Sequence, residues 1–413
     1  RLADHLSSRP AVLDSFLTPD FSRSLPSATE IKEELSQYLA RADYMEDVLN
    51  FSRRWAHDRR FQVGVQQLRG LIPPVEAATA LSNIAEAVVD CLFKPVHAEF
   101  IETHGVIEGS DVAVLALGKL GSREMTTNSD LDLVIIYGVP ANAAGSDGAK
   151  TLSVPQYFAR LSQRLINALT ALTPEGGLFE VDMRLRPSGN SGPIATTIEA
   201  FAAYHADQAW TWEHMALTRA RIISATSDKI QSDVEDTIQR VLTNPRPPEP
   251  LLRDVADMRA LLAREKPADC LWSLKQLRGG MVDIEFIAQY LALRHAAENP
   301  DILNSETLAL LQNLTRAGYL NASNGALLGD ALTMFQALQG TLSLTIEDEI
   351  ISQRVDTFSD ALKARLADVD KDADFNALEA KVTGTASRVF NLFQEIIDTP
   401  ASQLPALKQE PEA

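Results

Sequence analysis

Cysteine is scarce in this sequence, and its scarcity excludes two kinds of stabilised fold. Only Cys91 and Cys270 occur among 413 residues. There is no Cys-x-x-Cys pair and no Cys/His cluster at metal-ligand spacing, which argues against a disulfide framework and against a structural zinc site. A reducing compartment, the cytoplasm, is therefore expected.

Long apolar runs are also missing. No run approaches the roughly 18 to 20 residues that a membrane-spanning helix requires, and the first five residues lack the apolar core of a signal peptide. We therefore expect no membrane association. The sequence begins with Arg1 rather than Met, and we expect it to be a fragment of a longer protein.

Basic residues are in deficit. Lys and Arg total 38 against 56 Asp and Glu, which gives a formal net charge of −18. Such a surface repels polyanions, so nucleic-acid binding is not expected, and a nucleotide would need a local basic pocket or a metal ion. The remaining composition, 45% hydrophobic and 23% charged, is typical of a globular protein with two or three domains.

Hydrophobic periodicity divides the chain into three parts. Helical spacing over residues 28–69 and 75–102, with a kink or interruption at Pro95, predicts a helical leader. Short apolar runs at residues 112–117 and 131–137 predict buried strands, and strict alternation at 178–186 predicts a third strand with one polar face. Helical spacing returns after the proline-rich segment at 245–250, where we place a linker. The expected domains are a leader at 1–104, a sheet unit at 105–245 and a helical bundle with a polar tail at 246–413.

A glycine-rich turn follows the first predicted strand. Gly118, Lys119, Gly121 and Ser122 lie where a strand would pass into a turn and then into a helix. Backbone N–H groups in such a turn can bind phosphate, and glycine lets the backbone approach the ligand closely. The spacing fits neither a Walker A loop nor a dinucleotide-binding Gly-x-Gly-x-x-Gly turn.

Two carboxylates stand at the start of the second predicted strand. Asp130 and Asp132 are two residues apart, so both project from one face while their apolar neighbours point to the core. Close carboxylates repel unless a cation lies between them, and Mg²⁺ is the expected cation, as one ion or a pair. Asp182 on the third predicted strand could complete the cluster, with Arg184 and Arg186 on the same face to neutralise phosphate oxygens.

Each of these features also has a structural interpretation. An Asp-x-Asp pair alone is usually a solvated turn or strand end, and a Gly-Lys-Leu-Gly turn is mostly just a turn. Their combination with a third aspartate on an alternating strand favours a catalytic site.

Three further groups are interpreted as structural. Asp283 and Glu285 stand at the start of a predicted helix. Residues two apart on a helix point in different directions, so we expect capping and packing there. His205 and His214 have no third metal ligand nearby. An EF-hand-like spacing at Asp368, Asp370, Asp372 and Glu379 lacks the required glycine, and we expect Asp374 to cap a helix instead.

Five segments of the sequence carry a family resemblance, and they are Gly118–Glu124, Ser129–Leu133, Val181–Gly189, Trp210–His214 and Gly279–Phe286. Together they resemble the glutamine synthetase adenylyltransferase family, which belongs to the DNA polymerase β-like nucleotidyltransferases. The details of the last two segments resemble the C-terminal, adenylylating half of that bifunctional family. Residues 125–128 depart from the usual pattern, which affects the contacts of that loop and not the carboxylates.

The resemblance implies an α+β, mostly helical fold with a nucleotidyltransferase sheet unit. It implies transfer of AMP from ATP to a tyrosine of glutamine synthetase, with Mg²⁺ or its substitute Mn²⁺, and with the PII signalling protein and glutamine as partners. Asp182 would also act as base. The implied metal ligands are Asp130, Asp132 and Asp182, and the implied nucleotide-binding residues are Gly118, Lys119, Gly121, Ser122, Ser129, Arg184 and Arg186.

Two alternatives remain open at this point. The same carboxylates could remove AMP from the modified tyrosine by phosphorolysis. The chain could also be a non-catalytic module that responds to glutamine or PII, although the intact Asp130, Asp132 and Asp182 argue against this.

Overall fold

The computed structural model describes residues 25–346, 358–369 and 374–405. The chain forms two compact units, which are described separately. Unit 1 comprises Arg1–Ala209, Arg219–Val241 and Gln339–Glu347, and unit 2 comprises Trp210–Thr218, Leu242–Leu338 and Asp348–Ala413.

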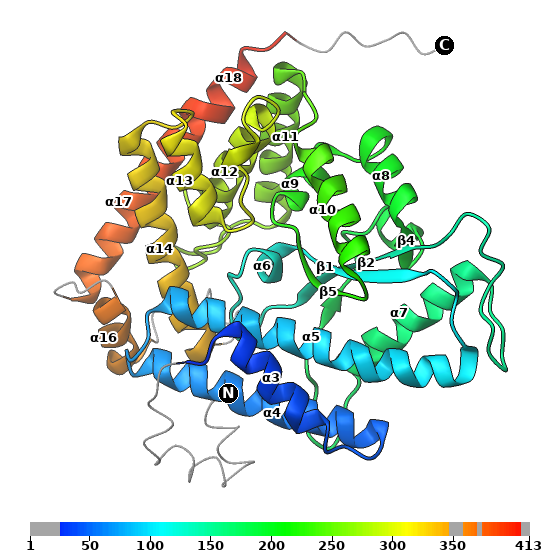
Figure 1. Ribbon diagram of the computed structural model, residues 1–413. Helices are drawn as coiled ribbons and strands as arrows, with labels where there is room; N and C mark the ends of the chain where they lie inside the picture. The colour runs from blue at the N-terminus through cyan, green and yellow to red at the C-terminus, as the bar shows by residue number, and fades with distance from the viewer. Residues whose placement is uncertain (1–24, 347–357, 370–373, 406–413) are drawn as a thin grey trace. The chain divides into compact units, whose positions relative to one another are not determined.

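Unit 1 starts with three helices that match the predicted helical leader. α3 begins with a capping box, in which the Ser27 hydroxyl accepts from the Glu30 N–H and the Glu30 carboxylate accepts from the Ser27 N–H. α5 runs through Pro95 and ends at His104 with Gly105 as its C-cap, so of the predicted kink or interruption at Pro95 the interruption is wrong. The helices are α3 (Ala28–Leu39), α4 (Met45–Leu68) and α5 (Pro74–His104) (Figure 1).

A small mixed sheet follows the leader in unit 1. Its strand order is β3-β2-β1-β5, and β4 also pairs with β2. β1 is antiparallel to β2 and β5, whereas β3 and β4 run parallel to β2. The strands are β1 (Asp111–Ala116), β2 (Leu131–Gly138), β3 (Val181–Asp182), β4 (Ala195–Thr197) and β5 (Arg221–Ala225), and the accompanying helices are α6 (Gly118–Gly121), α7 (Val154–Thr170), α8 (Ile198–Asp207) and α10 (Asp228–Leu242), with a 3₁₀ turn, η2, at Gly189–Ser191.

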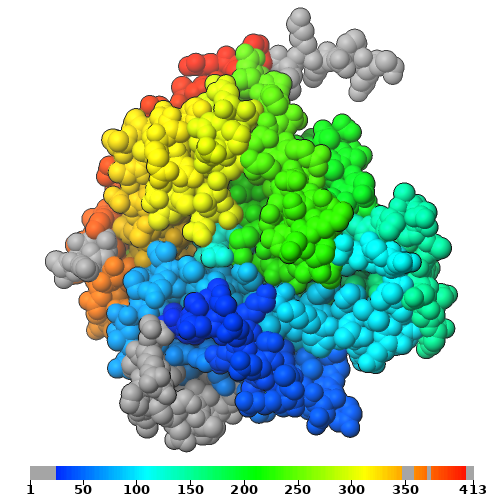
Figure 2. Space-filling model, in the orientation of Figure 1, coloured from blue at the N-terminus to red at the C-terminus, as the bar shows by residue number. Residues whose placement is uncertain are grey.

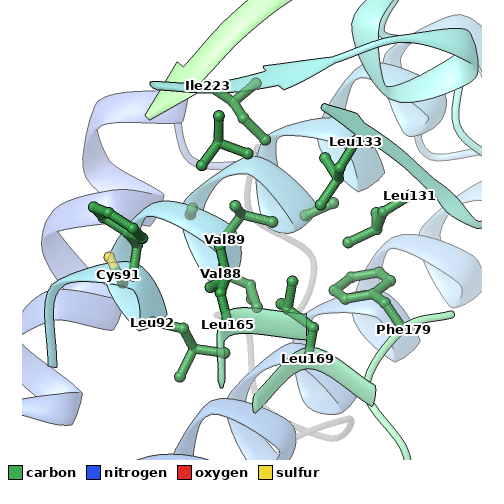
Figure 3. Close-up of a cluster of buried hydrophobic side chains, with 14 of the residues drawn as sticks. Val88, Val89, Cys91, Leu92, Leu131, Leu133, Leu165, Leu169, Phe179 and Ile223 are labelled. Carbon is green, nitrogen blue, oxygen red and sulfur yellow. The ribbon is translucent and has the colours of Figure 1, made fainter. Parts of the chain in front are cut away.

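The leader and the sheet share one hydrophobic core. α5 packs against α3, α4, α7 and β5, and its buried stripe includes the predicted residues Leu81, Ile84 and Val88. The domain boundary at residue 104 stays a prediction. The hydrophobic core of unit 1 includes residues on both sides of it. The close-up in Figure 3 shows side chains from α5, β2, α7 and β5 gathered together, among them Val88, Val89, Leu92, Leu131, Leu133, Leu165, Leu169 and Ile223.

Two local predictions in the sheet unit are wrong. The alternating segment 178–186 contributes only the two-residue strand β3, because the chain turns directly afterwards and the Arg186 N–H donates to the Met183 carbonyl. The glycine-rich turn is itself the single helical turn α6, and residues 122–130 form turns and loop rather than a longer helix. Asp182 therefore lies on a strand, but Arg184 and Arg186 do not.

Unit 2 is helical in its described residues, as predicted for the bundle. α12 is central and packs against α9, α11, α13 and α17. The predicted linker is short, since Pro248 already begins α11, a position that suits proline. The elements are α9 (Thr211–Leu217), α11 (Pro248–Glu265), α12 (Met281–His295), η3 (Pro300–Ile302), α13 (Thr307–Arg316), α14 (Ala322–Thr345), which continues into unit 1, α16 (Asp360–Val369), α17 (Phe375–Phe393), the π-helical turn η6 (Gln394–Asp398) and α18 (Thr399–Ser402).

Among the described residues, no helix has both the length and the apolar character that a membrane-spanning helix requires. The Asp374 side chain accepts a hydrogen bond from the Ala377 N–H at the start of α17, which confirms the predicted cap. Asp370 and Asp372 of the EF-hand-like spacing lie outside the described residues.

Candidate active site

Asp132 and Asp182 are direct neighbours across the β2–β3 pair. The two strands are parallel, and these residues are register partners. The pairing continues at the preceding residue, where the Leu131 N–H donates to the Glu180 carbonyl at 2.9 Å. Register partners on adjacent strands project from the same face of a sheet. The carboxylates of the second and third predicted strands are therefore brought together at the start of β2.

Asp130 lies just before β2 and is exposed. It is two residues from Asp132, and both aspartates act electrostatically on the Arg184 guanidinium, so they lie near the same group. The turn that delivers it is closed by Ser129, whose hydroxyl accepts from the Thr126 N–H at 2.9 Å and whose own N–H donates to the Thr126 carbonyl. Ser129 thus shapes the approach to the carboxylates.

The glycine-rich turn lies directly against Asp132. The Leu117 N–H donates to the Asp132 carbonyl at 2.9 Å, and Gly118 has a φ of +52°. A Cβ at Gly118 would overlap the Asp132 carboxylate, so glycine is required both for its conformation and for the close approach. Gly121 is equally enclosed, because a Cβ there would overlap the Arg219 carbonyl. The turn and Asp132 form one compact feature.

Arg184 forms an ion pair with Asp182. The Arg184 Nε and Nη2 atoms lie 2.7 and 2.5 Å from Asp182 Oδ2, and the Arg184 backbone N–H donates to Oδ1 at 2.8 Å. These hydrogen bonds hold the pKa of Asp182 below its usual value, with Arg186 adding a smaller attraction. The Asp182 carboxylate is thus held ionised beside a guanidinium whose side chain is 74% exposed.

The hydroxyl of Ser122 is engaged within the turn. It lies 2.9 Å from Glu124 Oε2 and 3.1 Å from the Gly118 carbonyl, and Arg219 Nη2 donates to it at 2.7 Å. Ser122 itself is buried. The next residue, Arg123, has a φ of +58°, which is unusual for a residue other than glycine and is often found near functional sites.

Arg186 is also used within the protein. Its guanidinium donates to the carbonyls of Met183 at 2.8 Å and Pro193 at 3.1 Å, which closes the loop after β3. Lys119 lies on α6 and is partly buried. The structure thus groups Asp130, Asp132, Asp182, Gly118 and Arg184, whereas the polar groups of Ser122, Ser129 and Arg186 stabilise the surrounding turns.

The donor set suits a hard divalent cation, because all three acids supply oxygen ligands. As they stand, no group of three or more His, Cys, Asp or Glu within residues 25–346, 358–369 and 374–405 is arranged to hold a metal ion. The three carboxylates repel one another because they carry like charges. Asp182 is also engaged in its ion pair with Arg184. The chemistry of the site fits Mg²⁺, and binding would require Asp182 to exchange Arg184 for the ion.

Sequence reasoning missed the residues that support the turn. Arg219 pairs with Glu124 at 2.6 Å, and Arg221 pairs with Glu86 of α5 at 2.6 Å while it donates to the carbonyl of Leu120 at 3.2 Å. Arg221 begins β5 and Arg219 lies in the turn before it, so no strand or helix period in the sequence marks the two as a pair.

Asp283, the first acid of the pair in unit 2, is structural, as predicted. Asp283 is fully buried in the first turn of α12, where it accepts from Arg259 Nε at 2.5 Å and from the Gly279 N–H at 2.5 Å. Arg278 lies 3.5 Å from the same carboxylate and stacks over Phe390. The Asp283 carboxylate is therefore not available to a ligand.

Comparison with known proteins agrees with this geometry. The model of the family described as glutamate-ammonia ligase adenylyltransferase matches residues 1–237, and that described as GlnD PII-uridylyltransferase matches residues 256–397. A curated relative from Rhodopseudomonas palustris (strain TIE-1) is 43% identical over 96% of this chain, and one from Xanthobacter autotrophicus (strain ATCC BAA-1158 / Py2) is 42% identical over 97%. Both are named bifunctional glutamine synthetase adenylyltransferase/adenylyl-removing enzyme, and the chain spans 40% of the length of each. The first match covers more than half of the chain, which therefore belongs to the glutamate-ammonia ligase adenylyltransferase family.

Proposed function

We propose that this chain transfers AMP from ATP to a tyrosine hydroxyl of glutamine synthetase and releases pyrophosphate. The observation that carries the proposal is the register pairing of Asp132 with Asp182, with Asp130 beside them and the glycine-rich turn against Asp132. Family membership supplies the reaction class. The names of the curated relatives supply the protein substrate.

The nucleotide would lie over the glycine-rich turn. Gly118, Lys119 and Gly121 would approach the ATP phosphates through the backbone and the lysine ammonium, with Ser122 and Ser129 fixing the shape of the site. Arg184 is the candidate cation for a phosphate, because its side chain is 74% exposed and only its ion pair with Asp182 must be exchanged. Arg184 would move from Asp182 to a phosphate oxygen, and Arg186 would add positive charge behind it.

Asp130, Asp132 and Asp182 would hold Mg²⁺, as two ions, or Mn²⁺ in its place. The bound ions would neutralise the charge that develops on the attacking and leaving oxygens. The carboxylates would set the position of the α-phosphate, because Asp132 and Asp182 are register partners on adjacent strands and Asp130 directly precedes β2.

The reaction assigns one proton-transfer role to the protein. Asp182, released when Arg184 moves to a phosphate oxygen, would accept the proton of the tyrosine hydroxyl as the tyrosine oxygen bonds to the α-phosphorus. The bond between the α-phosphorus and the bridging oxygen breaks at the same time, and the electron pair leaves with pyrophosphate. Asp182 then returns its proton to solvent.

Removal of AMP by phosphorolysis is the second candidate. The names of the curated relatives include adenylyl removal, and the same carboxylates could stabilise phosphate attack on the tyrosine-linked AMP. The forms of Trp210–His214 and Gly279–Phe286 resemble the adenylylating half and favour transfer.

We also propose regulation by the PII signalling protein and glutamine. The similarity of residues 256–397 to GlnD PII-uridylyltransferase supports a PII-related role for this part of the chain.

One experiment separates these functions. The purified chain is incubated with α-labelled ATP, Mg²⁺ and unmodified glutamine synthetase, and in parallel with adenylylated glutamine synthetase and inorganic phosphate. Label in glutamine synthetase indicates transfer, whereas formation of ADP from the adenylylated protein indicates removal. Absence of both reactions, with PII and glutamine either added or withheld, would leave only the non-catalytic module. Asp132→Asn serves as the inactive control.

A further inference from the structure

Asp182, the third candidate carboxylate, lies on a strand of two residues, which gives it little support from strand pairing. β3 has only two residues, and its pairing with β2 consists of two register partners. Asp182 is the second of these residues, and the chain turns immediately after it. Strands in folded proteins usually contain about five or six residues, so the position of Asp182 must depend on contacts to the segment that leads into β3.

Arg60 supplies such contacts from the helical leader. It lies on α4, and its Nη1 donates to the Leu178 carbonyl at 3.1 Å while its Nη2 donates to the Thr127 carbonyl at 2.5 Å. The guanidinium also lies over the ring of Phe179, 5.0 Å from its centroid. Leu178 precedes Asp182 by four residues, and Thr127 precedes Asp130 by three. One planar group therefore joins the two segments that carry the candidate carboxylates.

We propose that Arg60 is a positioning residue that sets the spacing between Asp182 and the Asp130–Asp132 pair. The proposal rests on the proposed function for its catalytic consequence, but the bridge itself rests only on the contacts of Arg60. A guanidinium presents its donors in a rigid plane, so it can hold two carbonyls at a fixed separation. Arg60 donates to backbone carbonyls in both segments and therefore acts through the backbone.

The neighbouring turns of α4 support the same segment. Arg53 donates to the carbonyls of Ala168 and Ala171 at 2.9 and 2.6 Å, and the His57 ring lies 2.8 Å from the Gly177 carbonyl. Arg53, His57 and Arg60 recur at spacings of four and three, so they share one face of the helix. Arg60 also donates to a carbonyl in the loop before Asp130. It is therefore the residue whose change should misalign the carboxylates without removing the support of the segment.

The matched test compares Arg60→Lys with Arg59→Lys. Lysine keeps the charge but has a single ammonium in place of the fork, so it cannot hold both carbonyls in the same way. Arg59 is the adjacent residue on the same helix, and its guanidinium pairs with Glu34 of α3 instead. The two variants make the same chemical change on one helix, and only Arg60→Lys removes the bridge.

The kinetic readout is the separation of kcat from KM. A shift of the carboxylates by about 1 Å can cost up to about 100-fold in rate, so Arg60→Lys should lower kcat by about 10- to 100-fold. KM for ATP should stay within about twofold, because the glycine-rich turn is untouched. Arg59→Lys should keep both values, and both variants should be folded by circular dichroism at the assay temperature. A kcat for Arg60→Lys within about twofold of wild type overturns the proposal, as does failure of that variant to fold.

Hydrogen exchange provides a readout that does not depend on activity. In the full chain, Arg60→Lys should increase exchange in peptides that cover residues 127–132 and 178–182 together, whereas Arg59→Lys should leave both at the wild-type rate. Unchanged exchange in both peptides shows that no bridge exists. If the exchange increases but the wild-type chain modifies no glutamine synthetase, the bridge stands and the proposed function fails.

Discussion

The same short pattern, acid-apolar-acid, occurs in both units with opposite outcomes. In unit 1, Asp130 is exposed and Asp132 lies at the start of β2 beside the glycine-rich turn. In unit 2, Asp283 is fully buried in the first turn of α12, and Glu285 is partly buried two residues later. The pattern alone therefore does not distinguish a candidate metal site from a structural ion pair.

Secondary structure accounts for the first part of the difference. Along an extended strand, residues two apart project from the same face, so two carboxylates can act together. On a helix, residues two apart are about 200° apart around the axis, so they face different surroundings. The Asp283 side chain is therefore buried, whereas Glu285 is partly exposed.

The partners account for the rest. Asp283 is matched by Arg259, which is only 2% exposed, and by the Gly279 N–H, so its charge is balanced inside the protein. In the unit 1 cluster, Asp182 pairs with Arg184, whose side chain is largely exposed, and an exposed ion pair is exchanged at little cost. A carboxylate whose counter-ion is mobile can exchange it for a metal ion or a substrate. One whose counter-ion is buried cannot.

The largest expected effect concerns activity in unit 1. Asp130→Asn or Asp132→Asn should lower AMP transfer by about 1,000-fold or more, since a lost metal ligand removes several kcal/mol of transition-state stabilisation. The free energy of unfolding should change by less than about 0.5 kcal/mol for the exposed Asp130. A transfer assay and urea unfolding of the same preparations test both points. Activity within a few-fold of wild type would remove these residues from any metal site.

The converse effect is expected in unit 2. Asp283→Asn should destabilise the chain by about 3 to 5 kcal/mol, because it leaves Arg259 as a buried charge without its counter-ion. Glu285→Gln is the matched control at the other acid of the pattern, and it should cost less than about 1 kcal/mol. Urea unfolding monitored by circular dichroism measures both. Equal losses for the two variants would show that burial of Asp283 does not decide its role.

A smaller effect is expected at the third carboxylate. Asp182→Ala should reduce kcat by at least about 100-fold, the lower end of the range for loss of a general base, while the affinity for ATP changes only a few-fold. The reason is that the glycine-rich turn lies against Asp132 rather than Asp182. Steady-state kinetics and a titration with a non-hydrolysable ATP analogue separate the two quantities. A loss of ATP affinity with unchanged kcat at saturation would assign Asp182 to nucleotide binding instead.

Sequence alone was sufficient for the parts of this site that local pattern determines. The apolar run after Asp130 predicts β2, and the position of Gly118 at the end of the preceding strand predicts the turn that lies against Asp132. The leader helices α3 and α4, coloured blue at the surface in Figure 2, also follow their predicted periodicity. These features depend on residues that are close in sequence.

The parts that sequence could not supply depend on distant backbone groups. Alternation at residues 178–186 predicts a long strand, but β2 offers register partners only for Val181 and Asp182. The contacts of Arg60 reach carbonyls 67 and 118 residues away, and a carbonyl is present at every residue, so no side-chain pattern identifies its partner. Arg60 on an amphipathic helix is indistinguishable by sequence from the surface-paired Arg59.

The smallest expected effect concerns the edge of the buried ion pair in unit 2. Asp398 lies 3.2 Å from Arg278, which also faces Asp283. Burial raises the pKa of Asp398, and the nearby Asp283 carboxylate adds to the rise while Arg278 opposes it. An acid with a raised pKa in the folded state contributes stability below its unfolded pKa of about 4, and this contribution is lost as the pH rises through its folded pKa.

Asp398→Asn removes this titration while keeping an acceptor for Arg278. The unfolding free energy of the variant relative to wild type should therefore rise between about pH 4 and pH 7, by less than about 1 kcal/mol because the pair is partly exposed. Urea unfolding at several pH values in that range measures the difference. If the variant instead loses stability relative to wild type as the pH rises, ionised Asp398 stabilises the fold at neutral pH. In that case the charge of Arg278 is matched by both Asp283 and Asp398, and Arg259 alone does not neutralise Asp283.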